Sequence, residues 1–247
     1  MNTFKEMNLP VFLQEALTEM KFSNPTEIQA RAYPAILSNR DLIGTAHVGA
    51  GKKIAICLPV ITRLLRLRQK SALILIPNRS LALKLEKTVN LLTSAGTGPK
   101  VAVLAGGKSL NAEAKALVEK PGIIIATPER LLEHLRSGNL SLFSTEILIL
   151  NETCQILASG QGSQLIEILR FLPKTRQTVL FAVEMTAEVE KVASKLLRDP
   201  VRIAAEPVAP VVTGLRKKTV AANSSVLVFN GSPATAPRPA KSSHRFV

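Results

Sequence analysis

The chain has 247 residues, of which 46% are hydrophobic, so it is long enough for one or two domains with a sizeable core. No apolar run approaches the roughly 20 residues of a membrane span, the first nine residues lack the pattern of a signal peptide, and Cys57 and Cys154 form no CxxC pair. We therefore expect no membrane partner, no disulfide framework and a reducing, cytoplasmic location. The formal net charge of +14 favours a polyanionic partner, most often a nucleic acid, and a merely basic surface is the alternative.

Residues 1–40 predict two helices. The first begins near Pro10, because the missing N–H of a proline costs nothing in the first turn of a helix. The second follows a break at Pro25 and carries Ile28, Ala32, Ile36 and Leu37 on one face.

A glycine loop follows the apolar run Asp41–Thr45 and reads Ala46-His47-Val48-Gly49-Ala50-Gly51-Lys52-Lys53. A strand, a glycine loop and a helix in this order are typical of a phosphate-binding loop. Glycines let backbone N–H groups turn toward an anion, and the lysine reaches the terminal phosphates. Ala46 replaces the first glycine of the general pattern, and Lys53 replaces its Ser or Thr. A simple tight turn is the alternative.

Beyond the loop, short apolar strands alternate with helices. The predicted strands are Ala72–Ile76, Val101–Ala105, Ile123–Ala126, Ile147–Leu150, Thr178–Val183 and Val201–Ala204, and the predicted helices lie near 51–69, 79–93, 109–119, 129–137, 162–171 and 186–197. This alternation predicts an α/β fold with a mostly parallel sheet covered by helices on both faces. Ligands of such sheets bind at the carboxyl ends of the strands, which places residues 77–80, 106–107, 127–130, 151–154 and 182–186 at the expected site.

The alternation stops near residue 205. Residues 206–247 are rich in Pro, Ala and Ser, and the stretch 207–247 carries a charge of +6 with no acidic residue. We predict one folded domain over 1–205 and a flexible basic tail over 206–247. Val226–Phe229 is too short to assign as a strand.

Read together, the residues after the strands resemble the first RecA-like domain of the DEAD-box RNA helicases over roughly residues 4–205. Phe4 and the stretch Lys21–Gln29, which reads Lys-Phe-Ser-Asn-Pro-Thr-Glu-Ile-Gln, are similar to the adenine-reading Q motif with its isolated upstream aromatic. Ala46–Lys53 looks like the phosphate loop of the family, whose first residue is normally Ala. Three further stretches resemble its RNA-backbone motifs: Pro77-Asn78-Arg79-Ser80-Leu81, Gly106-Gly107 and Thr127-Pro128-Glu129-Arg130.

The resemblance implies a RecA-like P-loop NTPase fold that holds ATP or ADP and contacts the backbone of structured or single-stranded RNA. The implied nucleotide-binding residues are Phe4, Phe22, Gln29, Ala46, Gly49, Ala50, Gly51, Lys52 and Lys53. The implied RNA-binding residues are Pro77, Arg79, Gly106, Gly107, Thr127, Pro128 and Arg130. Plain packing of Phe4 and Phe22, and solvated helix starts at Arg79 and Arg130, are the alternatives. We expect His134 on an exposed helix face, and neither it nor His47 indicates a metal site.

The departures from the family fall on its chemistry. Asn151-Glu152-Thr153-Cys154 stands where the family has Asp-Glu-Ala-Asp, and Ala182-Val183-Glu184 where it has Ser-Ala-Thr. Because Asn151 and Lys53 replace the residues that hold Mg²⁺ in the family, a metal is doubtful and no metal site is assigned. Lys53 either balances phosphate charge in place of the metal or points to solvent. Glu152 is a retained catalytic residue with little left to act on, and no second RecA-like domain is expected in residues 206–247.

These observations favour a degenerate DEAD-box RNA helicase-like domain, a pseudoenzyme that binds RNA, and possibly ATP or ADP, without efficient hydrolysis. Its expected context is a structured RNA or a ribonucleoprotein particle. One alternative is half of an active ATP-dependent RNA helicase that needs a second RecA-like domain in trans. Another is a non-functional fragment.

Overall fold

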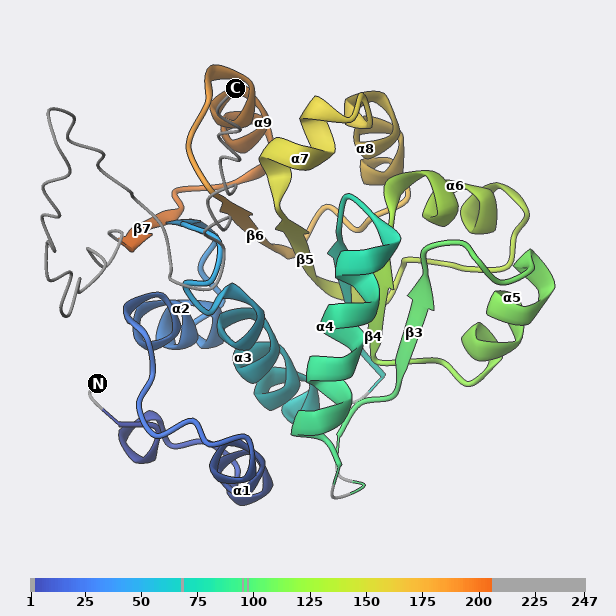
Figure 1. Cartoon of the computed structure of the whole chain (residues 1–247). Coiled ribbons are helices and arrows are strands. Elements are labelled where there is room, and N and C mark those ends of the chain that lie inside the picture. The colour runs from blue at the N-terminus through green and yellow to red at the C-terminus, as the bar shows by residue number, and fades with distance from the viewer. Residues whose placement is uncertain (1–2, 68, 95, 97, 206–247) are drawn as a thin grey trace, which may run out of the picture. The chain divides into compact units, whose positions relative to one another are not determined.

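The computed structural model describes residues 3–67, 69–94, 96 and 98–205. Within them, a seven-stranded sheet has the order β3-β4-β2-β5-β6-β1-β7, and every neighbouring pair is parallel (Figure 1). The strands are β1 (Leu42–Ala46), β2 (Ser71–Leu75), β3 (Val101–Leu104), β4 (Ile123–Ala126), β5 (Thr145–Asn151), β6 (Gln177–Ala182) and β7 (Val201–Ala205). The predicted α/β fold with a parallel sheet is confirmed.

The helices fall where the apolar periodicity predicts them, with ends shifted by a few residues at most. They are α1 (Val11–Glu19), α2 (Glu27–Leu37), α3 (Lys52–Arg66), α4 (Arg79–Leu92), α5 (Leu110–Val118), α6 (Pro128–Arg136), α8 (Gly162–Leu169) and α9 (Ala187–Leu196). Two short elements were not predicted: the 3-10 turn η1 (Lys5–Met7) and α7 (Thr153–Ala158). Both are too short to show a helical period in the sequence.

Helices cover both faces of the sheet, and successive strand residues point to opposite faces. In β2, Ala72 and Ile74 pack into one hydrophobic cluster with α1, α2, α3 and α4. Leu73 and Leu75 pack into the other cluster, with α5, α6, α7, α8 and α9. The strands are therefore apolar on both sides, which is why they read as continuous apolar runs rather than as alternating ones.

The sheet leaves little free space between β1 and β6, next to its β7 edge. Gly44 is paired in register with the fully buried Phe181. A Cβ atom at Gly44 would lie 2.5 Å from Cε1 of that ring. A glycine is therefore required here for packing, since any side chain would overlap the aromatic ring.

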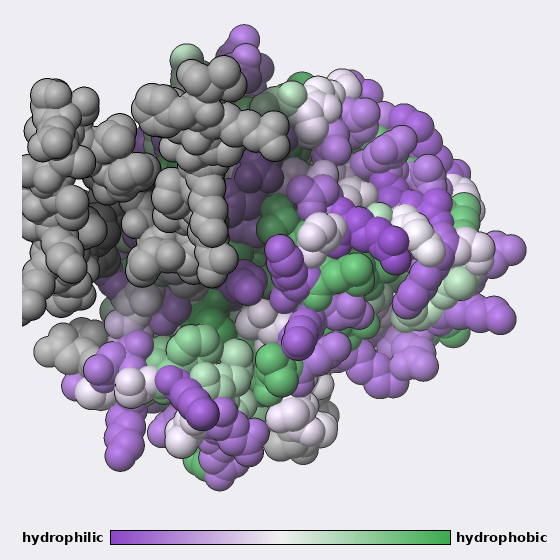
Figure 2. Space-filling view, viewed as in Figure 1, coloured by the Kyte–Doolittle hydropathy of each residue, from purple (hydrophilic) through white to green (hydrophobic). Residues whose placement is uncertain are grey.

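The predicted tail, residues 206–247, and the possible strand at 226–229 lie outside the described residues. No helix in the described part of the chain is long and apolar enough to cross a bilayer. On the face seen in Figure 2, hydrophilic side chains predominate on the right-hand side, over α5 and α6.

Candidate nucleotide and RNA site

The glycine loop connects the end of β1 to the start of α3, as the sequence predicts. Gly49 and Gly51 have φ values of 92° and 93°, a left-handed conformation that other residues adopt only with strain. This conformation brings the loop back over the first turn of α3, whose initial N–H groups have no partner within the helix. Loop and helix start therefore have the form of an anion-binding cradle.

Lys52, the first residue of α3, is buried beneath this loop. Its Nζ donates to the backbone oxygens of Ala46 at 2.7 Å and His47 at 3.2 Å, and it lies 3.1 Å from Oε1 of Glu152. The ammonium thus ties the loop to the end of β5. A phosphate bound in the cradle would compete with these two backbone oxygens for the Lys52 ammonium.

Gln29 and Thr26 hold the loop from the other side. The Gln29 amide accepts from the Thr26 N–H at 3.0 Å and donates to the Gly51 oxygen at 3.2 Å, while the Thr26 hydroxyl donates to the Ala50 oxygen at 2.9 Å. Thr26 is also the N-cap of α2, where the two side chains form a capping box. Gln29 therefore uses one N–H and one lone pair of its oxygen within the protein, which leaves one N–H and one lone pair.

Asn151 and Glu152 end β5 and begin α7, close to the loop. The Asn151 Oδ1 and Glu152 Oε2 atoms are buried and have no hydrogen-bond partner, and the same is true of His47 Nδ1. Glu152 has a φ of 57°, so a non-glycine residue occupies the left-handed region at this position. Unpaired buried polar atoms and a strained backbone gathered at one place are typical of a binding site.

These residues fit a divalent cation poorly. Mg²⁺ is held by carboxylates and phosphates in near-octahedral geometry, whereas Asn151 offers a neutral amide oxygen and Glu152 is already paired with Lys52. Lys53 is exposed and brings a further positive charge to the helix start. Among the residues that the structure describes, no cluster of three or more His, Cys, Asp or Glu side chains could hold a metal.

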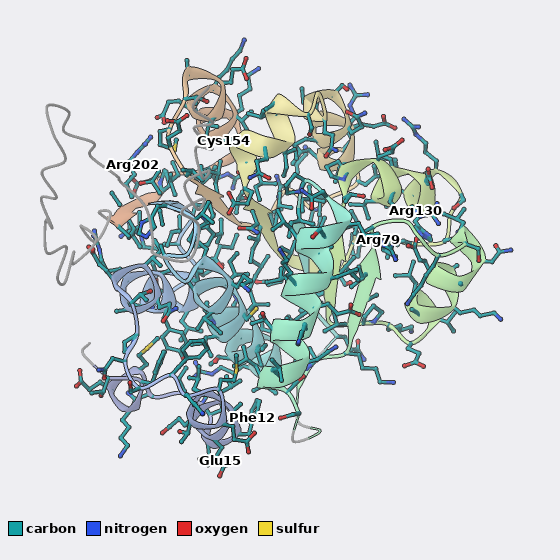
Figure 3. All side chains as sticks on the ribbon, viewed as in Figure 1. Phe12, Glu15, Arg79, Arg130, Cys154 and Arg202 are labelled. Carbon is teal, nitrogen blue, oxygen red and sulfur yellow. The ribbon has the colours of Figure 1, made fainter. Side chains whose placement is uncertain are left out.

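The two stretches that the sequence analysis found to depart from the DEAD-box pattern, 151–154 and 182–184, lie side by side at the ends of β5 and β6. Thr153 is fully buried and its hydroxyl contacts the backbone oxygens of Leu150 at 3.3 Å and Phe181 at 3.2 Å. Cys154, labelled in Figure 3, contacts the Glu184 oxygen through its sulfur at 3.2 Å. The start of α7 therefore contacts β6 and the segment after it.

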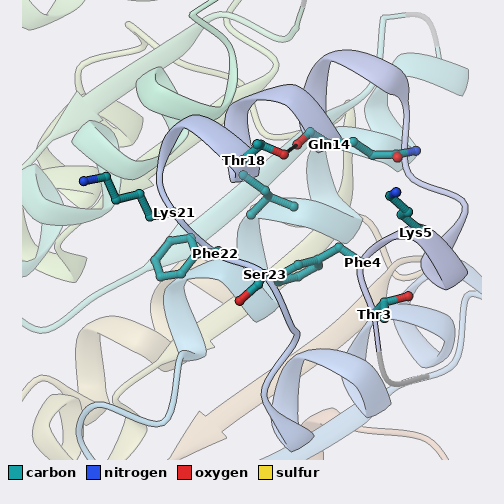
Figure 4. A pocket seen from close by; sticks show the side chains of 9 residues that line it. Thr3, Phe4, Lys5, Gln14, Thr18, Lys21, Phe22 and Ser23 are labelled. Carbon is teal, nitrogen blue, oxygen red and sulfur yellow. Dashed lines mark hydrogen bonds between the residues drawn. The ribbon is translucent and has the colours of Figure 1, made fainter.

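Phe4 and Phe22 line one pocket of about 480 Å³, beside α1 (Figure 4). Phe4 is only 6% exposed and belongs to the hydrophobic core, while Phe22 is 44% exposed. Neither Gln29 nor the phosphate loop lines this pocket. Phe4 is therefore mostly packed in the core, which was the alternative that the sequence analysis left open for it. Phe22 has the larger exposed surface of the two.

The three predicted RNA-contacting segments follow β2, β3 and β4, at the same end of the sheet. A Cβ atom at Gly107 would lie 2.1 Å from Cζ of Arg79, so the guanidinium packs directly on the glycine. Gly106 and Gly107 have φ values of 76° and 82°. Thr127 precedes α6 as its N-cap, and Pro128, at the first position of the helix, is buried, as is Pro77 after β2.

Glu113 joins two of these segments. One carboxylate oxygen accepts from the Gly106 N–H at 3.2 Å, and the other accepts from Arg130 Nε at 2.6 Å and lies 3.0 Å from His134 Nε2. Arg130 also contacts the Lys108 oxygen at 2.9 Å. Burial would raise the pKa of Glu113, but hydrogen bonds from His134 and Arg130 lower it below its ordinary value, and the same contact raises the pKa of Arg130.

This cluster corrects one expectation and adds a residue that the sequence analysis missed. The prediction that His134 lies on an exposed face is wrong, because its side chain is fully buried against Glu113. Glu113 was missed, although it lies four residues before the buried Leu117 and thus on the apolar face of α5. A charged residue on the apolar face of a predicted helix could have indicated a buried carboxylate with a partner.

The model of the DEAD/DEAH box helicase family matches residues 26–192. The chain is 39% identical over 204 residues to the ATP-dependent rRNA helicase RRP3 of Yarrowia lipolytica, an alignment that covers 82% of this chain and 42% of the relative. It is 36% identical to the DEAD-box ATP-dependent RNA helicase 28 of Arabidopsis thaliana, with 89% of this chain and 28% of the relative covered. The chain thus spans less than half the length of these relatives.

Solved structures show the same relationship. A DEAD box protein from the hyperthermophile Methanococcus jannaschii superposes with a TM-score of 0.78 at 29% identity, over 83% of this chain and 56% of that one. The yeast DEAD-box splicing factor Prp28 gives a TM-score of 0.77 at 29% identity, over 83% of this chain and 52% of that one. Together with the parallel sheet and the phosphate loop, these matches show that the chain belongs to the DEAD/DEAH box helicase family and corresponds to its N-terminal RecA-like domain.

Proposed function

We propose that this domain binds the RNA backbone and holds ATP or ADP, without hydrolysing the nucleotide efficiently. The observation that carries the proposal is the state of the site after β5, where the buried Asn151 offers a neutral oxygen and Glu152 is paired with Lys52. Phosphoryl transfer depends on positioning and on cations that neutralise the developing charge. Here a single carboxylate, already bound to an ammonium, is present where a metal would have to be held.

Nucleotide binding is supported by the cradle itself. Gly49 opens toward free space, with nothing within 4 Å of the position of a Cβ atom. Lys52 is held below the loop and Lys53 stands exposed beside it. Two ammonium groups at a helix start suit an anion, because their charges there oppose the helix dipole unless a phosphate compensates them.

RNA binding is supported by the way Arg79, Gly106–Gly107 and Arg130 gather at the carboxyl ends of β2, β3 and β4. Arg79 packs on Gly107, while Gly106 and Arg130 both contact Glu113. Figure 3 shows the two arginines near each other. Guanidinium groups and backbone N–H groups recognise phosphates and riboses without reading bases. We expect binding to be independent of sequence and to weaken steeply with salt. A structured RNA within a ribonucleoprotein particle is the proposed context.

The test is calorimetry with ATP and ADP, with and without Mg²⁺, together with ATP turnover in the presence of single-stranded RNA. We expect nucleotide binding that is indifferent to Mg²⁺, RNA binding, and turnover near background. The double variant Asn151→Asp/Lys53→Thr restores the family residues and should make nucleotide affinity depend on Mg²⁺. Clear Mg²⁺-dependent turnover by the unaltered chain would instead support an active helicase half, and absence of both nucleotide and RNA binding would overturn the proposal.

A further inference from the structure

We propose that Glu113 is a positioning residue for RNA binding, which fixes the Gly106–Gly107 turn and the Arg130 guanidinium as one unit. The inference rests on the proposed RNA-binding function and adds a residue that the motifs do not contain. Glu113 comes from α5, Arg130 from α6, and Gly106 from the turn after β3. Three segments thus meet at one carboxylate.

The contacts of Glu113 use both of its oxygens. Oε1 accepts from the Gly106 N–H at 3.2 Å, and Oε2 accepts from Arg130 Nε at 2.6 Å. The residue is 3% exposed, so water is largely excluded from these bonds. Hydrogen bonds between charged groups are roughly twice as strong as neutral ones, and low exposure adds to their directional effect.

Each terminal nitrogen of the Arg130 guanidinium makes a further contact within the protein. Nη1 contacts Glu133, and Nη2 donates to the Lys108 oxygen at 2.9 Å. His134 Nε2 lies 3.0 Å from the same oxygen of Glu113, and its side chain is fully buried. The guanidinium therefore has one orientation, and 17% of its side chain remains exposed at the surface.

The Gly106–Gly107 turn completes the unit. Arg79 packs on Gly107, and Gly106 is tied to Glu113, so the two arginines are connected through the turn between them. Two cations with a fixed separation suit a phosphate backbone, whose charges are regularly spaced. A carboxylate that merely lowered the positive charge of this surface would weaken RNA binding, whereas one that orders the two cations strengthens it. The two roles predict effects of opposite sign when the carboxylate is neutralised.

The experiment compares the RNA affinity of the full chain with that of Glu113→Gln. This substitution keeps an oxygen for the Gly106 N–H but places an amide N–H₂ against Arg130 and His134, and it raises the net charge by one. We expect the affinity for single-stranded RNA to fall about tenfold, which is the effect expected from the loss of one charge-assisted hydrogen bond. Glu119→Gln is the matched control, because Glu119 follows the same helix, is exposed and pairs only with Lys100 at 2.7 Å among the ion pairs described. It should leave affinity unchanged or slightly raised.

A second variant keeps the proposal testable if Glu113→Gln does not fold. Arg130→Lys leaves the net charge unchanged and removes the planar group that contacts Glu113, so it should weaken RNA binding, whereas Arg136→Lys on the same helix should not. Equal or tighter RNA binding by Glu113→Gln, or unchanged binding by Arg130→Lys, would overturn the inference. Failure of the unaltered chain to bind RNA would count against the proposed function itself, and the two failures are therefore distinguishable.

Discussion

The ammonium of Lys52 lies 3.1 Å from the carboxylate of Glu152, and the two residues are only 6% and 9% exposed. Lys52 is the first residue of α3 and Glu152 directly follows β5, so this ion pair connects the two elements at the candidate nucleotide site. Opposite charges with little access to water stabilise each other, but either charge alone would be costly to bury.

Replacing Lys52 by Met should therefore destabilise the fold by about 3 kcal/mol, because it leaves the Glu152 carboxylate buried without a cation. Urea denaturation measures the change. Lys53→Met is the control, since Lys53 lies in the same first turn of α3 and is exposed. It should change stability by less than about 0.5 kcal/mol. Similar effects of the two variants would show that the buried pair has no special role in stability.

Gly51 should tolerate a side chain less well than Gly49. Both have left-handed φ values, 93° and 92°, so alanine is strained at either position by about 1 kcal/mol. At Gly51 the added Cβ would also lie 2.3 Å from Nε2 of Gln29, whereas at Gly49 it would meet no atom within 4 Å.

We therefore expect Gly51→Ala to lower the free energy of unfolding by about 2 kcal/mol more than Gly49→Ala, because it displaces the Gln29 amide that holds the loop. Chemical denaturation of both variants gives the difference. Equal destabilisation would mean that the Gln29 contact contributes nothing beyond backbone strain.

Local signals predicted the elements of this fold, but long-range contacts could not be predicted from them. The strands are apolar on both sides and the main helices are amphipathic, so short windows of sequence were enough to find them. α7 was missed because it has six residues and begins after the left-handed Glu152. The burial of His134 depends on Glu113, 21 residues earlier, and no periodicity in α6 contains that contact.

The candidate site divides in the same way. The loop glycines and the residues after β2, β3 and β4 could be placed at one edge, because parallel strands end together. The pairing of Lys52 with Glu152 crosses from α3 to β5, so its geometry came only from the folded structure. The roles assigned to Phe4, Gln29, Arg79 and Arg130 stay predictions until ligand binding is measured.

The pH dependence of stability should reveal the Glu113 cluster. The pKa of the Glu113 carboxyl group in the folded state lies below the ordinary value of 4.5. Burial alone would raise this pKa, but the hydrogen bonds with His134 and Arg130 lower it by more. A carboxylate with a lowered pKa stabilises the fold above its unfolded pKa, and this contribution is lost as the pH falls through the folded value.

Urea midpoints measured from pH 7 to pH 3 should therefore fall more steeply below about pH 4.5 for the unaltered chain than for Glu113→Gln, which has no such proton to bind. Glu119→Gln serves again as the control, and comparison with it separates Glu113 from a carboxylate in an exposed ion pair. Parallel curves for the unaltered chain and Glu113→Gln would show that Glu113 has the same pKa in the folded and unfolded states.

The packing of Gly44 against Phe181 gives a last prediction, on the sheet that supports the site. Gly44→Ala should destabilise the fold by about 1–3 kcal/mol, because its Cβ overlaps a ring that cannot move within a fully buried environment. Phe181→Leu alone should also destabilise it, by leaving a cavity. In the double variant the smaller Leu side chain makes room for the Ala methyl group, so the combined loss should be about 1 kcal/mol less than the sum of the single losses. A double-mutant cycle by urea denaturation measures this coupling, and strictly additive losses would mean that the sheet relaxes around the extra methyl group without help from position 181.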